Sequence, residues 1–211
     1  MLIANGYQQT VSAQYHRISN ANLALQAGYN YQQRYYADFS AALIHSAKLA
    51  KGHRQALSPS VTLGWRLSNE NFLKDSPVVD DLLLSVSGSI LNQDIDLVMG
   101  DNEFYLYESV WTQNDGYAWY DGPAGKYTIS TRGQNSDLSF IKRKEFSANL
   151  KTSLWNRLIT ADASFFINSM EGYLINQPTF YPSHLNTGYP AASFMAVLNY
   201  NNNKRVGFDF N

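Results

Sequence analysis

Aromatic side chains that could contact a ligand are concentrated in one polar stretch, between residues 105 and 127. The stretch also contains Asn114, Asp115 and Asp121, so flat rings and hydrogen-bonding groups occur together. Tyrosine and tryptophan combine a large rigid contact surface with a polar group, which suits the binding of sugars. The alternative is that the rings form an aromatic belt at a membrane surface or a small core of the loop itself. The candidate ligand contacts are Tyr105, Tyr107, Trp111, Tyr117, Trp119 and Tyr120.

Side chains that could perform catalysis or hold a metal lack the usual motifs. The four histidines lie far apart, and none has a partner at zinc-ligand spacing. An acidic stretch offers oxygen ligands for Ca²⁺, but Val98 and the position of Gly100 break the EF-hand pattern and favour a solvated loop. Its members are Asp94, Asp96, Asp101 and Glu103. No nucleophile elbow, phosphate-binding loop or dinucleotide fingerprint occurs. We therefore expect no catalytic residue, no metal, no cofactor and no enzymatic activity.

The composition indicates a chain with two contrasting surfaces. It contains 15 Tyr, 11 Phe and 4 Trp against 16 Lys plus Arg and 17 Asp plus Glu, yet its mean hydropathy is slightly polar at -0.33. A transmembrane barrel has such an average, because its lipid-facing and lumen-facing residues alternate. A net charge of -1 gives no field that would attract nucleic acid. No run approaches the roughly 20 apolar residues of a membrane-spanning helix, so any crossing must use strands.

Alternation of apolar and polar residues is the dominant local pattern and predicts strands. Between residues 58 and 67, Val61, Leu63 and Trp65 fall on one face, whereas Thr62 and Arg66 fall on the other. The same pattern recurs in segments of about ten residues, the length of a tilted transmembrane strand. The predicted strands are 58–67, 82–91, 146–154 and 158–168, with weaker examples at 7–17, 22–31 and 35–45 and a last one starting near Lys204.

Strands of a membrane barrel and of a soluble β-sandwich both alternate apolar and polar residues. The lengths of the connections between the strands favour the membrane barrel. Tight turns are expected at residues 32–34 and 155–157, whereas residues 46–57, about 93–140 and 169–203 form long connections. If successive strands reverse direction, the tight turns lie at one end and the long connections at the other, as in outer-membrane barrels. The fold class predicted is therefore all-β, an antiparallel transmembrane β-barrel segment of about eight to ten strands.

The polar sides of these strands supply the residues that would face the barrel lumen. They include both charges and an amide, and their simplest role is that of a solvated wall. The lumen-facing candidates are Asp38, Arg66, Asn149, Lys151 and Asp162.

Several segments resemble the SusC/RagA family of TonB-linked outer membrane proteins, which is found in Bacteroidetes. Ser58 to Lys74 reads SPSVTLGWRLSNENFLK and resembles the family's FPSVSLGWRLSEExFLK stretch. Gly28 to Ser40 reads GYNYQQRYYADFS and resembles NYNYKDRYYLDAS. The later stretches KEF at 144–146, WNRL at 155–158 and NKRVGF at 203–208 follow in the family's order, although Phe208 replaces the Glu of its NKGVE signature.

The resemblance implies a protein larger than this chain. Family members form a plugged barrel of about 22 strands, of which residues 1–211 would be part, with the plug domain and the TonB box absent. The first residues lack the features of a signal peptide, so export is expected to need upstream sequence. The family implies a wall segment of an importer in the cell outer membrane, in contact with its lipid. It further implies uptake of an oligosaccharide or peptide with a SusD-type lipoprotein and the TonB complex.

Two alternatives remain open at this point. The first is a small stand-alone porin or adhesin barrel, which needs a closing strand that pairs with the first strand. The second is a soluble β-sandwich module that binds a ligand, which predicts apolar faces turned inward.

Overall fold

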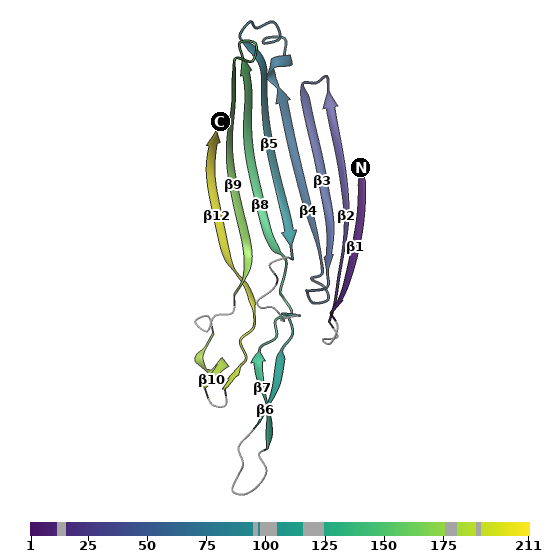
Figure 1. Ribbon diagram of the computed structural model, residues 1–211, viewed down its shortest axis with the longest axis vertical. Helices are drawn as coiled ribbons and strands as arrows, with labels where there is room; N and C mark the ends of the chain where they lie inside the picture. The colour runs from purple at the N-terminus through teal and green to yellow at the C-terminus, as the bar shows by residue number, and fades with distance from the viewer. Residues whose placement is uncertain (12–15, 95–96, 98–104, 116–124, 176–180, 189–190) are drawn as a thin grey trace.

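Eight long strands form one antiparallel sheet in the computed structural model, which describes residues 1–11, 16–94, 97, 105–115, 125–175, 181–188 and 191–211 (Figure 1). The strands run in the order β1 (Leu2–Val11), β2 (His16–Tyr31), β3 (Tyr35–Ser46), β4 (Gln55–Arg66), β5 (Val79–Gln93), β8 (Ile141–Leu154), β9 (Ile159–Ile175) and β12 (Leu198–Phe210). Sheet neighbours therefore follow one another along the chain, apart from two inserted hairpins. These are β6 (Val110–Asp115) with β7 (Lys126–Arg132), and β10 (Asn186–Gly188) with β11 (Ala191–Ser193).

The all-β antiparallel class is confirmed, and so are most of the predicted strands. The strand expected at 7–17 is wrong in its boundaries, because β1 ends at Val11 and β2 begins at His16. Gln8 and Gln9 place polar side chains on both sides of β1, so alternation could not locate the turn there. Two short 3-10 turns, Leu67–Asn69 and Ser183–Leu185, complete the described elements. No described helix is long and apolar enough to span a bilayer.

The strand register gathers apolar side chains into continuous rows on one face of the sheet. One row crosses seven strands through Tyr29, Ala37, Leu63, Val86, Ala148, Phe165 and Phe208. The side chains of this face are open to the surroundings, and Leu63 is 56% exposed. The adjacent row, with Asp38, Thr62, Ser87 and Ser147, belongs to the opposite face. A soluble sandwich would cover the apolar face with a second sheet, which the described residues do not form.

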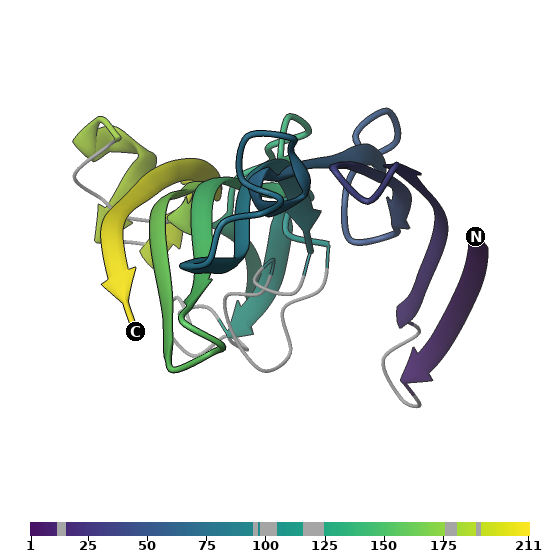
Figure 2. The same ribbon diagram turned by 90° about the horizontal axis from the view of Figure 1, so that it is seen from above.

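The sheet is curved, and its polar face lies on the inner side of the curve. Figure 2 shows it from above as an arch with β1 and β12 at its two edges. Ile44, Ala56 and Met170, which lie on the polar face by register, pack against an apolar cluster formed by the long connections. Along β4 and β5 the apolar side chains are exposed, whereas their polar neighbours are half-buried. This difference in exposure fits the curvature, because side chains on the concave side converge and cover one another.

The two ends of the sheet differ, as the sequence predicted. Figure 1 places the β2–β3, β4–β5 and β8–β9 connections at one end and the long connections at the other. Both tight turns use positive φ angles that favour close hairpins: 51° at Gln32 and 54° at Gln33, then 52° at Asn156. The Asp80 carboxylate accepts a hydrogen bond of 2.8 Å from the Arg157 backbone N–H, which ties the second turn to β5.

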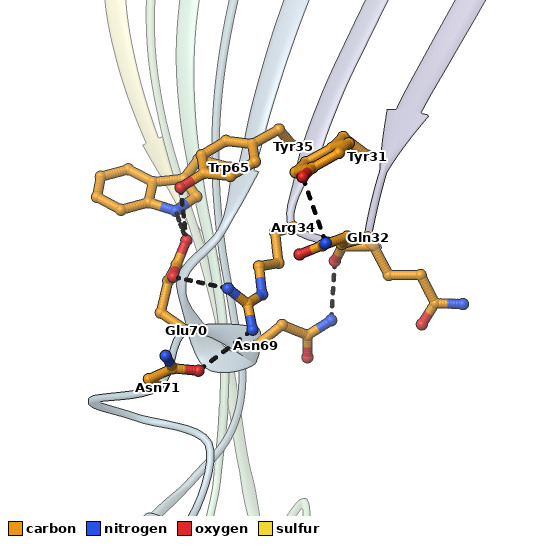
Figure 3. A network of polar contacts seen from close by, with 9 residues as sticks. Tyr31, Gln32, Arg34, Tyr35, Trp65, Asn69, Glu70 and Asn71 are labelled. Carbon is orange, nitrogen blue, oxygen red and sulfur yellow. Dashed lines mark hydrogen bonds and ion pairs between the residues drawn. The ribbon is translucent and has the colours of Figure 1, made fainter.

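The β4–β5 connection is longer than the β2–β3 and β8–β9 turns, and it carries an anchoring carboxylate. Glu70 Oε1 accepts hydrogen bonds from the Tyr35 hydroxyl at 2.8 Å and from Trp65 Nε1 at 3.0 Å (Figure 3). Its other oxygen lies 3.5 Å from Arg34 Nη1. These hydrogen bonds, Tyr35 first, and the Arg34 charge hold the pKa of the Glu70 carboxyl below its ordinary value. The connection thus fixes aromatic rings of β3 and β4.

The assignment of the two faces predicts that a new charge lowers the free energy of unfolding more on the apolar face than on the polar face. Leu63→Lys should destabilise the protein in lipid vesicles by about 2–4 kcal/mol, since it places an ammonium in hydrocarbon. Thr62→Lys, one residue away on the polar face, should change stability little. Unfolding of each variant in vesicles by guanidinium chloride measures the two free energies. A larger cost for Thr62→Lys would mean that the faces are assigned the wrong way round.

The contacts of Glu70 predict that the stability of the protein depends on pH. Because the folded pKa is below the ordinary value of 4.5, the stabilisation is complete above that pH and is lost as the pH falls through the folded pKa. The unfolding midpoint of the wild type should therefore drop in this acidic range, and Glu70→Gln should lose this part of the drop. Asp75→Asn, in the same connection, is the control and should keep the wild-type profile.

Candidate functional site

The long connections are held together by a small apolar core. It lies at the end of the sheet opposite the tight turns, which is called the long-loop end below (Figure 1). This core is unusual in the molecule because its side chains are almost fully shielded, whereas most large apolar side chains of the strands are exposed. It joins the β3–β4, β5–β8 and β9–β12 connections, so these segments form one platform. Its members are Leu49, Leu97, Leu106, Leu138, Phe140, Ile141 and Val197.

A buried arginine organises the start of the aromatic stretch. The Arg132 guanidinium donates to the backbone carbonyls of Glu108, at 3.2 Å from Nε, and of Tyr105, at 3.3 Å from Nη2. Between these carbonyls Leu106 inserts into the loop core, while Tyr107 packs against it. The Tyr105 and Tyr107 rings meet edge to face at 6.0 Å. Both predicted ligand contacts are therefore half-buried parts of the loop itself.

Trp111 is placed differently and keeps a free ring surface. Its side chain is 55% exposed, and its Nε1 donates to Ser109 Oγ at 3.3 Å. The ring packs edge to face on Phe194, 6.0 Å away in the β9–β12 connection, and Phe194 is itself exposed. Phe194 was not among the predicted ligand contacts, because no local sequence pattern distinguishes it. Tyr117, Trp119 and Tyr120 lie outside the described residues.

One asparagine at the start of β12 fastens the end of the β5–β8 connection to the sheet. Asn199 Nδ2 donates to the carbonyls of Ser139 at 3.1 Å and Gly172 at 2.7 Å, and its Oδ1 accepts from the Ser139 N–H at 2.9 Å. Gly172 has a φ of +83°, which glycine adopts without strain, and β12 is irregular opposite it. The segment that leads into β8 is thereby held beside β9 and β12.

A second polar anchor holds the β3–β4 connection. The Asp94 carboxylate accepts hydrogen bonds from Ser46 Oγ at 2.6 Å and Asn20 Nδ2 at 3.0 Å. Lys48 Nζ donates to the Asp94 carbonyl at 2.8 Å. Asp94 therefore ties β2 and β3 to the end of β5. Asp96, Asp101 and Glu103 lie outside the described residues, and the described part of the chain contains no group of carboxylates and histidines that could hold a metal.

The concave face brings the lumen-facing candidates together. The register aligns Arg66, Lys151 and Asp162 in one row, Asn149 in the next, and Asp38 in the row beyond. Arg66 Nε lies 3.2 Å from Asp81 Oδ1, and its guanidinium covers the Tyr36 ring at 5.6 Å. The Asn149 amide donates to Ser147 Oγ at 3.3 Å. All five candidates share this face; that it lines a lumen stays a prediction.

Nearer the loop core, the concave face contains a hollow of about 350 Å³. Small side chains from neighbouring strands leave this space, among them Ser40, Ala42, Ser60 and Ser89. Gln26 and Glu145 add longer polar groups at its edge. Apolar residues such as Ile3, Ala24 and Leu91 make up most of its lining, so the hollow combines an apolar surface with a few hydroxyl, amide and carboxylate groups.

Comparison with known proteins places this arrangement in a wider group. No family model matches the chain. The TonB-dependent receptor SusC of Bacteroides thetaiotaomicron is 30% identical over 149 residues, which cover 69% of this chain and 14% of that receptor. Two TonB-dependent receptors of Formosa agariphila are 24% and 22% identical, over 75% and 71% of this chain and 14% of each relative. The chain therefore spans about one seventh of the length of these relatives.

Solved structures show the same fold. The RagAB peptide importer in its open-open state matches with a TM-score of 0.73 and 21% identity, and in its closed-closed state with 0.69 and 20%. In both cases the match covers 92% of this chain and 19% of the other. These relatives are named as receptors and importers, not as enzymes. The chain therefore belongs with the TonB-dependent receptors of the SusC/RagA type and represents part of their antiparallel strand wall.

Proposed function

We propose that the chain is a wall segment of a nutrient importer in the cell outer membrane, driven through TonB. The observation that carries this proposal is the contrast between the two faces. Exposed apolar rows around Leu63 and Val86 suit contact with lipid, whereas the concave face carries serine, amide and charged groups. A polar substrate entering among the long connections would pass along that concave face.

The substrate is an oligosaccharide or a peptide, and an oligosaccharide is the favoured choice. Trp111 and Phe194 present adjoining exposed rings at the long-loop end. The Trp111 N–H already has a partner in Ser109, so the free part of the side chain is its ring surface, which stacks on the flat side of a sugar. The solved RagAB structures are of a peptide importer, and peptide side chains would use the same rings.

A SusD-type lipoprotein is the proposed partner at the long-loop end, by analogy with SusC and RagAB. The loop core and the hydrogen bonds of Asn199 and Arg132 support this assignment because they pre-organise the connections. A platform that is already ordered loses less conformational entropy when a partner covers it. TonB would act on the importer through parts of the protein beyond this strand wall.

Uptake should depend on energy as well as on the protein. Cells that lack the gene should lose uptake of the cognate oligosaccharide or peptide, and collapse of the proton-motive force should stop uptake in the wild type. Transport of radiolabelled substrate measures both effects. Uptake that continues without the proton-motive force would contradict the TonB-driven proposal and favour a passive porin.

Trp111→Ala should weaken substrate binding about tenfold, because it removes a stacking surface worth roughly 1.5 kcal/mol. Trp155→Ala is the matched control, since Trp155 has a similar exposure of 48% but lies in the tight turn at the other end. Calorimetric titration of the purified protein with substrate provides the measurement. Equal effects of the two substitutions would show that Trp111 makes no special contact.

A further inference from the structure

We propose that the apolar face of the sheet holds one phospholipid at the short-turn end, where the β2–β3 and β8–β9 turns lie. Its acyl chain would occupy a groove over Ala37, and its phosphate would lie beside Arg34. This inference rests on the proposed location in the outer membrane. It adds a binding site on the side of the sheet that faces away from the substrate.

The groove is apolar and lies among β2, β3, β4 and β5. Its volume is about 380 Å³, within the range of roughly 300–1,000 Å³ typical of small-molecule sites. Ala37 lies between Tyr29 and Leu63 in the row that crosses the sheet, and its methyl group leaves the space that the larger neighbours enclose. Tyr35 and Trp65 line the end of the groove nearest to the tight turns.

The aromatic row marks the level where a phospholipid changes from chain to headgroup. Tyr31, Tyr35 and Trp65 are neighbours across β2, β3 and β4, and their rings stack at 6.4 Å for each successive pair. Aromatic rings with a polar edge gather at membrane–water interfaces. The Tyr35 hydroxyl and the Trp65 N–H both point to Glu70, on the turn side of the row, as Figure 3 shows.

Arg34 supplies hydrogen-bond donors for the phosphate. It lies directly before Tyr35, and its side chain is 26% exposed. One Nη contacts Glu70 and the other donates to Asn71 at 3.2 Å, so these contacts orient the guanidinium without using all five of its N–H groups. An arginine held in this way retains donors for phosphate oxygens. Tyr35 joins the two halves of the site, because its ring lines the groove and its hydroxyl shares Glu70 with Arg34.

A phospholipid is the occupant that fits both halves. Hydrocarbon covers the exposed apolar rows in the proposed membrane setting, so an acyl chain is the molecule present at the groove. A lipid without a phosphate would leave the remaining Arg34 donors unused, and a free phosphate would leave the groove empty. The site therefore selects a molecule that carries an anionic group and a hydrocarbon chain together.

The first test measures lipid that stays bound to the full-length protein after extraction from outer membranes with a mild detergent. Native mass spectrometry should find one retained phospholipid in the wild type. Arg34→Gln and Ala37→Leu should each lower the occupied fraction about tenfold, as expected for the loss of a charged hydrogen bond or of the groove. Ala148→Leu is the matched control, because Ala148 lies in the same row outside the groove. Equal retention in all four proteins would overturn the proposal.

The second test separates the contributions of chain and phosphate. Delipidated protein is titrated with dioleoyl phosphatidylethanolamine and with dioleoylglycerol, which has the same chains but no phosphate. The phospholipid should bind about tenfold more tightly to the wild type and equally to Arg34→Gln. Equal binding of the two lipids to the wild type would overturn the role of Arg34.

The same proteins distinguish this inference from the importer proposal. All variants should appear in the outer-membrane fraction and transport substrate, with unfolding midpoints showing that Arg34→Gln and Ala37→Leu are folded. Transport without a retained lipid would overturn only the lipid site. A protein that is absent from the outer membrane would overturn the importer proposal together with this one.

Discussion

Continuous backbone pairing across the sheet is the constraint on which the rest of the molecule depends. An unpaired peptide group in hydrocarbon costs several kcal/mol, so strands in a bilayer must satisfy one another. This pairing fixes the register, and the register sorts the side chains into an apolar and a polar face. A shift of β4 by one residue would turn Leu63 inward and Thr62 outward, which reverses both faces at once.

The connections between paired strands are held in place by different interactions at the two ends of the sheet. At the short-turn end, charged and polar groups around Glu70 hold a connection of 12 residues, from Leu67 to Val78, against β3 and β4. At the long-loop end, the β3–β4, β5–β8 and β9–β12 connections are held by an apolar core, and Asn199 and Arg132 fix the backbone of the β5–β8 connection. The short-turn end therefore relies on directional bonds, whereas the long-loop end relies mainly on the exclusion of water.

The sequence allowed the strands and their faces to be predicted because alternation is a local property. Asp38, Arg66, Asn149, Lys151 and Asp162 were placed on one face by counting residues in twos, and the register agrees with that count. The loop platform could not be foreseen, since it joins segments far apart in the chain. The side chain of Arg132 resembles any surface arginine until its carbonyl partners are known. The ligand contacts predicted in the aromatic stretch stay a prediction, and spacing alone could not separate the half-buried Tyr107 from the exposed Trp111.

The exposed apolar rows also affect how the protein behaves in water. A sheet that presents Leu63, Val86 and Phe165 to water carries a patch of the kind that drives self-association. Hydrophobic strands of this type are most vulnerable while they are still unpaired. In the proposed outer-membrane setting, the newly made chain would have to insert into lipid before these rows associate with one another.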